Sequence, residues 1–144
     1  MIASATEFCR LRESADPDEY RRASHEEAPV AVWREVIRDR PDMRFWAAQN
    51  KTVPLEILEE LAGDSDVRVR DMVARKRKIS ESIAVRLARD EDESVRAALT
   101  YNRKLPERAL AILRADPSPF VQEKVHSRER SGLTPEPTRF ARGS

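Results

Sequence analysis

The chain has 144 residues, enough for one domain with a modest core, because small domains leave a large share of their surface in water. Charged residues make up 37% of the sequence and aromatic residues 6%, a composition that suits narrow helical layers with wide solvated faces. The net charge of +1 gives no global field that would hold a polyanion, and the single cysteine, Cys9, excludes an internal disulfide and multi-cysteine metal sites.

The N-terminal segment lacks the basic start and apolar run of a secretory signal, and nowhere do 18 apolar residues follow one another. We therefore expect a cytoplasmic protein without a membrane partner. Residues 1–16 place Phe8, Cys9 and Leu11 on one face of a helix, which predicts a segment that caps the N-terminal end of the fold.

Residues 17–127 contain an internal repeat with a spacing of 26 residues in its clear copies. Four columns hold these copies in register: Leu61, Leu87 and Leu113; Asp64, Asp90 and Asp116; Val69, Val95 and Val121; Val73, Leu99 and Val125. Asn50 and Pro54 lie 52 residues before Asn102 and Pro106, which adds an earlier copy. A more degenerate copy lies upstream of these, so the sequence predicts four to five repeats.

Each copy predicts two short helices. The first follows the aspartates, which can cap its free N–H groups, and it carries apolar residues at spacings of three and four, as in Val69, Met72 and Val73. The second begins at Pro29, Pro54, Ser80 or Pro106 and has apolar residues three, four and seven positions later.

Helices this short are marginal alone in water, so each pair must bury its apolar stripe against its neighbours. The predicted fold class is therefore all-α, a short α-solenoid of stacked helix pairs. Residues 128–144, rich in glycine, proline and polar side chains, are predicted to form a flexible C-terminal tail.

The motif Asp-x-x-x-x-Val-Arg at residues 64–70 and 90–96, with its flanking leucines, resembles bacterial HEAT-like repeats. The leucine-rich repeat variant, which also alternates short helices, is a close second. The resemblance covers about three quarters of the chain and implies a scaffold that could serve many partners. Some leucine-rich repeat variant proteins hold an iron–sulfur centre in a cysteine cluster, which the single Cys9 excludes here.

Motifs for catalysis are missing from the sequence. With only three glycines, at 63, 132 and 143, neither a phosphate-binding P-loop nor a GxGxxG dinucleotide motif can form. His25 and His126 lie near opposite ends of the repeats, so a hydrolase triad lacks parts that could meet. We therefore expect a protein that is not an enzyme and that has no cofactor and no metal site.

The arginine column of Arg44, Arg70 and Arg96 has two interpretations. It could bind phosphates or an acidic partner, or it could pair with the aspartates of neighbouring repeats as an internal ladder. The resemblance to HEAT-like stacks, where an arginine in this column commonly makes such pairs, favours the ladder.

Residues out of phase with the core indicate where a partner would bind. Phe45 aligns with polar or small residues in the other copies and is expected to be exposed, while Gln49, Arg75 and Tyr101 share a neighbouring outward column. Aromatic and arginine side chains are typical of binding hot spots. A single Phe or Tyr on a helix can equally well cover a neighbouring repeat, because isolated surface apolar residues are common. We expect a monomer that docks a protein or peptide, as an adaptor, immunity or regulatory partner, in a concave groove formed by Phe45, Gln49, Arg75 and Tyr101.

The turn between the two helices of each copy is basic and supports an alternative function. The cations that align there are Lys51, Arg77, Lys78, Arg103 and Lys104. Stacked repeats would join them into a ridge that could bind nucleic acid phosphates or an acidic protein surface. Cations also favour helix C-termini, where they face the negative end of the dipole, so part of this enrichment is structural.

Overall fold

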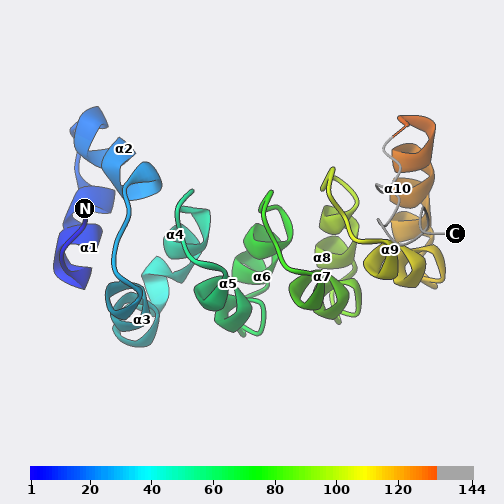
Figure 1. Ribbon diagram of the computed structural model, residues 1–144, viewed down its shortest axis with the longest axis horizontal. Helices are drawn as coiled ribbons and strands as arrows, with labels where there is room; N and C mark the ends of the chain where they lie inside the picture. Colours follow the sequence, from blue (N-terminus) through cyan, green and yellow to red (C-terminus); the bar gives the residue numbers. More distant parts are fainter. Residues whose placement is uncertain (133–144) are drawn as a thin grey trace, which may run out of the picture. The chain divides into compact units, whose positions relative to one another are not determined.

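The computed structural model describes residues 1–132, and this part of the chain contains α-helices, one 3-10 helix and no strand (Figure 1). The predicted all-α class is confirmed. The elements, in chain order, are α1 (Ala5–Glu13), α2 (Pro17–His25), α3 (Val30–Asp39), η1 (Pro41–Met43), α4 (Arg44–Gln49), α5 (Leu55–Leu61), α6 (Val67–Ala74), α7 (Glu81–Ala88), α8 (Glu93–Leu99), α9 (Glu107–Arg114) and α10 (Pro119–Arg130).

The helices belong to two compact units, a first unit from Met1 to Val73 and a second unit from Ala74 onward. In the first unit α1 packs on α2 and α3, α2 on α4, and α3 on α4 and α5. In the second unit α7 packs on α8 and α9, and α10 packs on α8 and α9. Within each unit, helices therefore contact the next helix and the next but one, as expected when helix pairs follow one another.

The apolar positions that define the repeat form the core of each unit. The residues that lie three, four and seven positions after Pro29, Pro54, Ser80 and Pro106 are all buried. They are Val32, Trp33, Val36, Ile57, Leu58, Leu61, Ile83, Ala84, Leu87, Ala109, Leu110 and Leu113. Phe8, Cys9 and Leu11 of α1 are also buried, as predicted for the N-terminal segment. Burial of each large side chain contributes about 1.5–3 kcal/mol, so the shared pattern supplies the main driving force of the fold.

The polar residues at the start of the helices act as caps. Asp66 and Asp92 each accept a hydrogen bond from the N–H two residues later, at 2.9 and 2.8 Å, and Ser80 accepts from the N–H of Ile83 at 3.2 Å. The predicted capping role of these residues is confirmed. Pro54 and Pro106 occupy the N-cap position itself, one residue before the helix begins.

Arginine–aspartate pairs join successive copies within each unit. The Arg44 Nη1 to Asp64 Oδ2 distance is 3.3 Å, and Arg96 Nε lies 2.7 Å from Asp116 Oδ2. The side chains of both aspartates are largely shielded from solvent, being 7% and 4% exposed. Arg70 is buried and donates to the carbonyl of Asp64 at 2.8 Å. The predicted internal ladder is confirmed for Arg44 and Arg96.

A second set of bonds connects each turn to the turn one repeat earlier. Asn50 Nδ2 donates to the carbonyls of Ala23 and Glu26, at 2.8 and 3.1 Å, and Asn102 Nδ2 donates to the carbonyl of Lys76 at 3.0 Å. Each asparagine also accepts, through Oδ1, from the N–H two residues later. Asparagine recurs in this column because its amide satisfies two turns at once.

Arg128 occupies the same column 26 residues after Asn102 and acts in the same way. Its Nη1 donates to the carbonyls of Thr100 and Asn102, at 2.8 and 2.6 Å, and the residue is 3% exposed. The segment predicted to be a tail from residue 128 therefore begins inside α10, because this buried contact holds the helix to Arg130. The rest of the predicted tail, residues 133–144, lies outside the described residues.

The Asn50 contacts make a prediction for stability. Replacing Asn50 by Ala removes the donor for two carbonyls and the acceptor for the Thr52 N–H, so we expect the free energy of unfolding to fall by about 2 kcal/mol in a urea titration followed by circular dichroism. Glu35→Ala, on the exposed face of α3, should change it by less than about 0.5 kcal/mol. Equal stability of the two variants would contradict a structural role for the Asn50 contacts.

Candidate binding surface

The residues predicted to form one protein-binding groove are divided between the two units. Phe45 and Gln49 lie in the first unit, whereas Arg75 and Tyr101 lie in the second. Phe45 is half-buried, because its ring meets the ring of Trp46 edge to face with 4.8 Å between centroids. Phe45 is therefore only partly exposed to solvent. Gln49 is also half-buried, while Arg75 and Tyr101 are exposed.

Trp46, beside Phe45, is itself covered by an arginine of α1. The guanidinium carbon of Arg12 lies 3.3 Å from the centroid of the Trp46 ring and 4.4 Å from that of Tyr20. A cation above aromatic faces is a stabilising arrangement inside a folded unit. The aromatic side chains of this region are thus largely occupied with one another and with Arg12.

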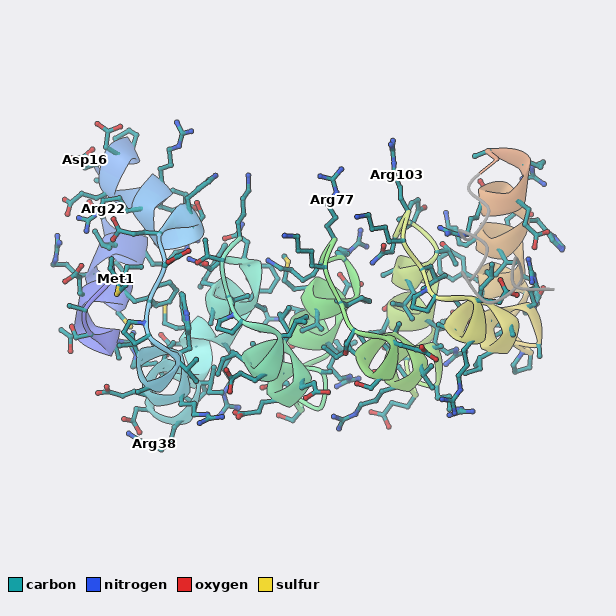
Figure 2. The ribbon with its side chains drawn as sticks, in the orientation of Figure 1. Met1, Asp16, Arg22, Arg38, Arg77 and Arg103 are labelled. Atoms are coloured by element: carbon teal, nitrogen blue, oxygen red, sulfur yellow. The ribbon has the colours of Figure 1, made fainter. Side chains whose placement is uncertain are left out.

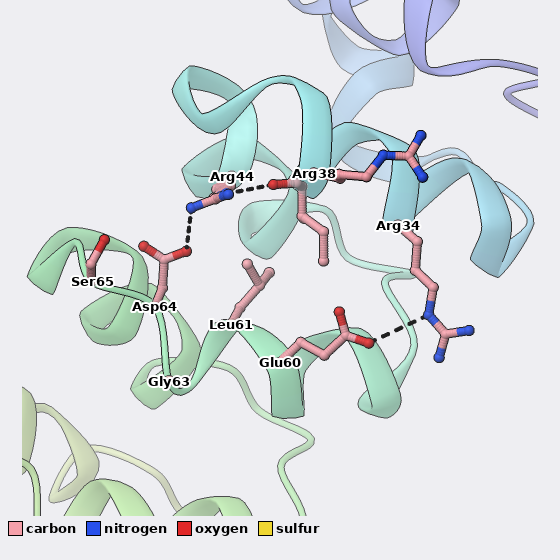
Figure 3. A pocket seen from close by; sticks show the side chains of 9 residues that line it. Arg34, Arg38, Arg44, Glu60, Leu61, Gly63, Asp64 and Ser65 are labelled. Carbon is pink, nitrogen blue, oxygen red and sulfur yellow. Dashed lines mark hydrogen bonds and ion pairs between the residues drawn. The ribbon is translucent and has the colours of Figure 1, made fainter.

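A hollow of about 540 Å³ in the first unit lies between α3, α4 and the end of α5 (Figure 3). Its charged groups already have partners. Arg44 binds the Ile37 carbonyl at 2.6 Å in addition to Asp64, and Arg34 pairs with Glu60 at 3.4 Å. These pairs serve the ladder and the helix surface, so the hollow offers few free groups to a ligand.

The second unit exposes two aromatic rings around one lysine. Tyr101 is 60% exposed and Phe120 is 45% exposed. Lys124 Nζ lies 5.7 Å from the centroid of Tyr101 and 5.5 Å from that of Phe120. We call Tyr101, Lys124 and Phe120 the aromatic platform.

Phe120 was not among the predicted site residues. Arg68 and Ser94 stand 52 and 26 residues before it, so an aromatic side chain there breaks the repeat pattern as Phe45 does. The comparison that singled out Phe45 could therefore have found Phe120, which the structure leaves far more accessible.

Four predicted ridge residues lie on neighbouring turns of the second unit. Arg77 and Lys78 follow α6, Arg103 and Lys104 follow α8, and all four are exposed. The hydrogen bond from Asn102 to the Lys76 carbonyl joins the two turns, and Figure 2 shows Arg77 and Arg103 extending away from the helices on the same side. We call these four residues the basic turns. Lys51, the fifth predicted cation, is exposed on a turn of the first unit.

Among the described residues, the cations of the basic turns have no acidic partner, unlike many arginines of the same part of the chain. Arg22, Arg34, Arg40 and Arg114 all form ion pairs, as do both arginines of the ladder. Among residues 1–132, no ion pair involves Arg77, Lys78, Arg103 or Lys104. Their charges therefore remain available to a partner.

The near-neutral net charge hides a separation between the units. Residues 1–73 contain 11 Lys and Arg against 16 Asp and Glu, a formal charge of −5. Residues 74–132 contain 14 against nine, a formal charge of +5. The unit that carries the basic turns is thus basic as a whole, which favours an anionic partner for it.

Side chains suited to metal binding do not cluster in the part of the chain that the structure describes: no three His, Cys, Asp or Glu side chains gather there as a metal site would require. The helices of residues 1–132 also include none with the length and apolar character needed to cross a bilayer.

Comparison of the chain with protein-family models, with curated proteins and with solved structures found no match in any of the three. The proposals for function therefore depend on the residues of this chain and their surroundings.

Cys9, the only thiol, is expected to react slowly in the folded protein. The residue is 4% exposed, and burial raises the pKa of its thiol, which lowers the fraction of reactive thiolate near neutral pH. Labelling with a chromogenic disulfide should be much slower for the folded than for the urea-unfolded chain, and should accelerate as pH rises. Equal rates in both states would show that Cys9 is accessible.

Proposed function

We propose that the chain is a non-catalytic binding module, built as a short HEAT-like α-solenoid. Three features support the solenoid: the 26-residue spacing across residues 61–125, the packing of most helices on the next but one within each unit, and the ladders that join successive copies. Repeat stacks of this kind use their long surfaces to hold extended partners.

We propose further that the second unit binds single-stranded nucleic acid through the basic turns. The observation that carries this proposal is the presence of four exposed cations without acidic partners on two hydrogen-bonded turns. An elongated polyanion can release counterions along such a row and so gain affinity without specific base contacts. Duplex and single strands share this electrostatic term.

The aromatic platform favours a single strand over a duplex. Proteins that bind single strands without sequence preference combine a positive surface with side chains on which bases stack. Tyr101 is the second residue before Arg103, and its ring is mostly open to solvent. A strand whose phosphates follow the basic turns could therefore place a base on Tyr101 or Phe120, which a closed duplex could not do.

A protein or peptide partner is the second candidate, and it is favoured by the same platform. Tyr101 and Phe120 are exposed aromatic rings of the described part of the second unit, and Arg75, 26 residues before Tyr101, is also exposed. An acidic peptide with aromatic residues would satisfy both the charges and the rings. Such a partner would contact Tyr101, and not Phe45 and Gln49, which belong to the first unit.

The nucleic-acid proposal is tested by anisotropy of a labelled oligothymidine strand over a range of salt concentrations. We expect binding at low salt, and a double variant Arg77→Ala with Arg103→Ala should weaken it about tenfold or more, because two phosphate contacts are lost. The slope of log affinity against log salt should fall by about 1.4, at about 0.7 for each contact. Tyr101→Ala should cost about 1–3 kcal/mol of binding free energy through lost stacking.

The matched control is Arg89→Ala, an exposed arginine on the loop between α7 and α8 and outside the basic turns. It removes one charge from the same unit, so it should change the affinity much less than the double variant. If the wild-type chain binds no strand at low salt but binds an acidic aromatic peptide, the nucleic-acid proposal fails and the second candidate replaces it.

A further inference from the structure

Arg128 is a buried arginine that uses only part of its hydrogen-bonding capacity. Its Nη1 donates to the Thr100 and Asn102 carbonyls, which fixes the guanidinium beside the turn that carries Arg103. Its Nε and Nη2 are buried and have no partner among the described residues. A guanidinium stays charged in proteins, so two charged donors remain unsatisfied in a site sheltered from water.

The two unsatisfied nitrogens form one edge of the guanidinium, and elsewhere in this chain the same edge binds oxyanions. In Arg40, Arg68 and Arg96 the Nε and Nη2 donors bind the two oxygens of a single carboxylate, at distances from 2.7 to 3.4 Å. A two-oxygen anion is the ligand that matches this planar fork. Among residues 1–132, no group accepts a hydrogen bond from this edge of Arg128.

A cavity of about 70 Å³ lies beside this arginine. It is lined by Thr100, Tyr101, Lys124, Ser127, Arg128 and Ser131. These residues comprise two cations and four hydroxyl groups, without a carboxylate. The hydroxyls of Thr100 and Ser131 donate to carbonyls of their own helix or turn. The donors left over in the cavity wall come from Arg128, Lys124, Tyr101 and Ser127.

The size and the donors of this cavity fit a phosphate group. The cavity of about 70 Å³ is larger than the roughly 10–15 Å³ that one water molecule needs, and it can hold a group of phosphate size. A phosphate monoester carries nearly two negative charges and three strong acceptor oxygens. Two of these oxygens can occupy the Arg128 fork, which leaves the third for Lys124 or a hydroxyl, whereas a carboxylate would leave those donors unused.

The charge at this site also favours an anion. Burial, and to a smaller degree the neighbouring charge of Arg114, lower the pKa of Arg128, so its environment opposes the positive charge. A bound anion would stabilise the charged guanidinium and so raise the pKa of Arg128 again.

We propose that the cavity at Arg128 is a binding site for a phosphate group, supplied by the phosphorylated end of the strand that the basic turns hold. The source of the phosphate, unlike the anion site itself, rests on the proposed nucleic-acid function. Arg128 binds the carbonyl of Asn102, the residue directly before Arg103, so the cavity adjoins the basic turns and its lining includes Tyr101 of the aromatic platform. A strand bound along the basic turns would thus place its terminal phosphate in the cavity at Arg128.

The anion site is tested first with inorganic phosphate alone. Titration of the full-length chain should shift the ¹H–¹⁵N resonance of Arg128 Nε, and acetate at equal ionic strength should bind more weakly. Arg128→Lys keeps one donor for the two carbonyls but removes the fork, so phosphate affinity should fall about tenfold or more. The control is Arg130→Lys on the same helix, an exposed residue paired with Glu123, which should leave phosphate affinity unchanged.

Ser127→Ala provides a variant that spares the buried arginine. It removes one hydroxyl from the cavity wall and should weaken phosphate binding a few-fold while leaving the circular dichroism spectrum unaltered. If the Arg128 resonance does not respond to phosphate, or if acetate binds as well as phosphate, the proposal is overturned.

The source of the phosphate is tested with oligothymidine strands that differ only in a terminal phosphate. Tighter binding of a strand phosphorylated at one end, with the advantage lost in Arg128→Lys, supports the strand end as ligand. If inorganic phosphate binds at Arg128 but no strand binds the chain, the nucleic-acid function fails and the anion site stands. Strand binding that ignores the terminal phosphate overturns the assignment of the source.

Discussion

The hydrogen bond between one turn and the turn of the preceding repeat is the contact on which the arrangement of each unit depends. The helices have six to twelve residues, too few to be stable alone, so their apolar faces need a fixed register. Asn50 and Asn102 provide it by binding carbonyls of the earlier turn with Nδ2 and an N–H of their own turn with Oδ1. Arg128 continues the column with a longer side chain that reaches two carbonyls. Because these groups are buried, a slip of one repeat against another would leave polar atoms unsatisfied.

The hydrogen bond from Asn102 to the Lys76 carbonyl also determines which cations lie close together. By joining residues 76 and 102 it makes their turns neighbours, so Arg77 and Arg103 present adjacent charges although 26 residues separate them. Several other arginines pair with nearby carboxylates, in the ladder or across helix surfaces. The distinction between paired and unpaired arginines is therefore more informative about function than the total charge. The total of +1 combines −5 from residues 1–73, +5 from residues 74–132 and +1 from residues 133–144.

Phe45 and Arg128 have surroundings that the repeat pattern and the composition did not predict. Phe45 broke the repeat pattern and was expected to meet solvent, but Trp46 beside it gives its ring an edge-to-face contact. Arg128 stood in a segment that composition alone marked as a tail, and its burial depends on the carbonyls of a turn 26 residues earlier. For Phe45 the contact is with the next residue in the chain, whereas for Arg128 it is with carbonyls 26 and 28 residues earlier, which the local composition does not reveal.

The sequence by itself determined the helical class, the positions of the repeat helices and the capping residues. These features follow from local rules, in which apolar spacing sets the buried face and a side chain caps its own helix, and the 26-residue period repeats each rule. Only the tertiary structure decided which side chains remain accessible and unpaired: Tyr101 and Phe120 around Lys124, the four cations of the basic turns, and the unfilled edge of Arg128. Exposure and pairing depend on the packing of residues distant in sequence, and a period that aligns residues in columns does not reveal which of them meet.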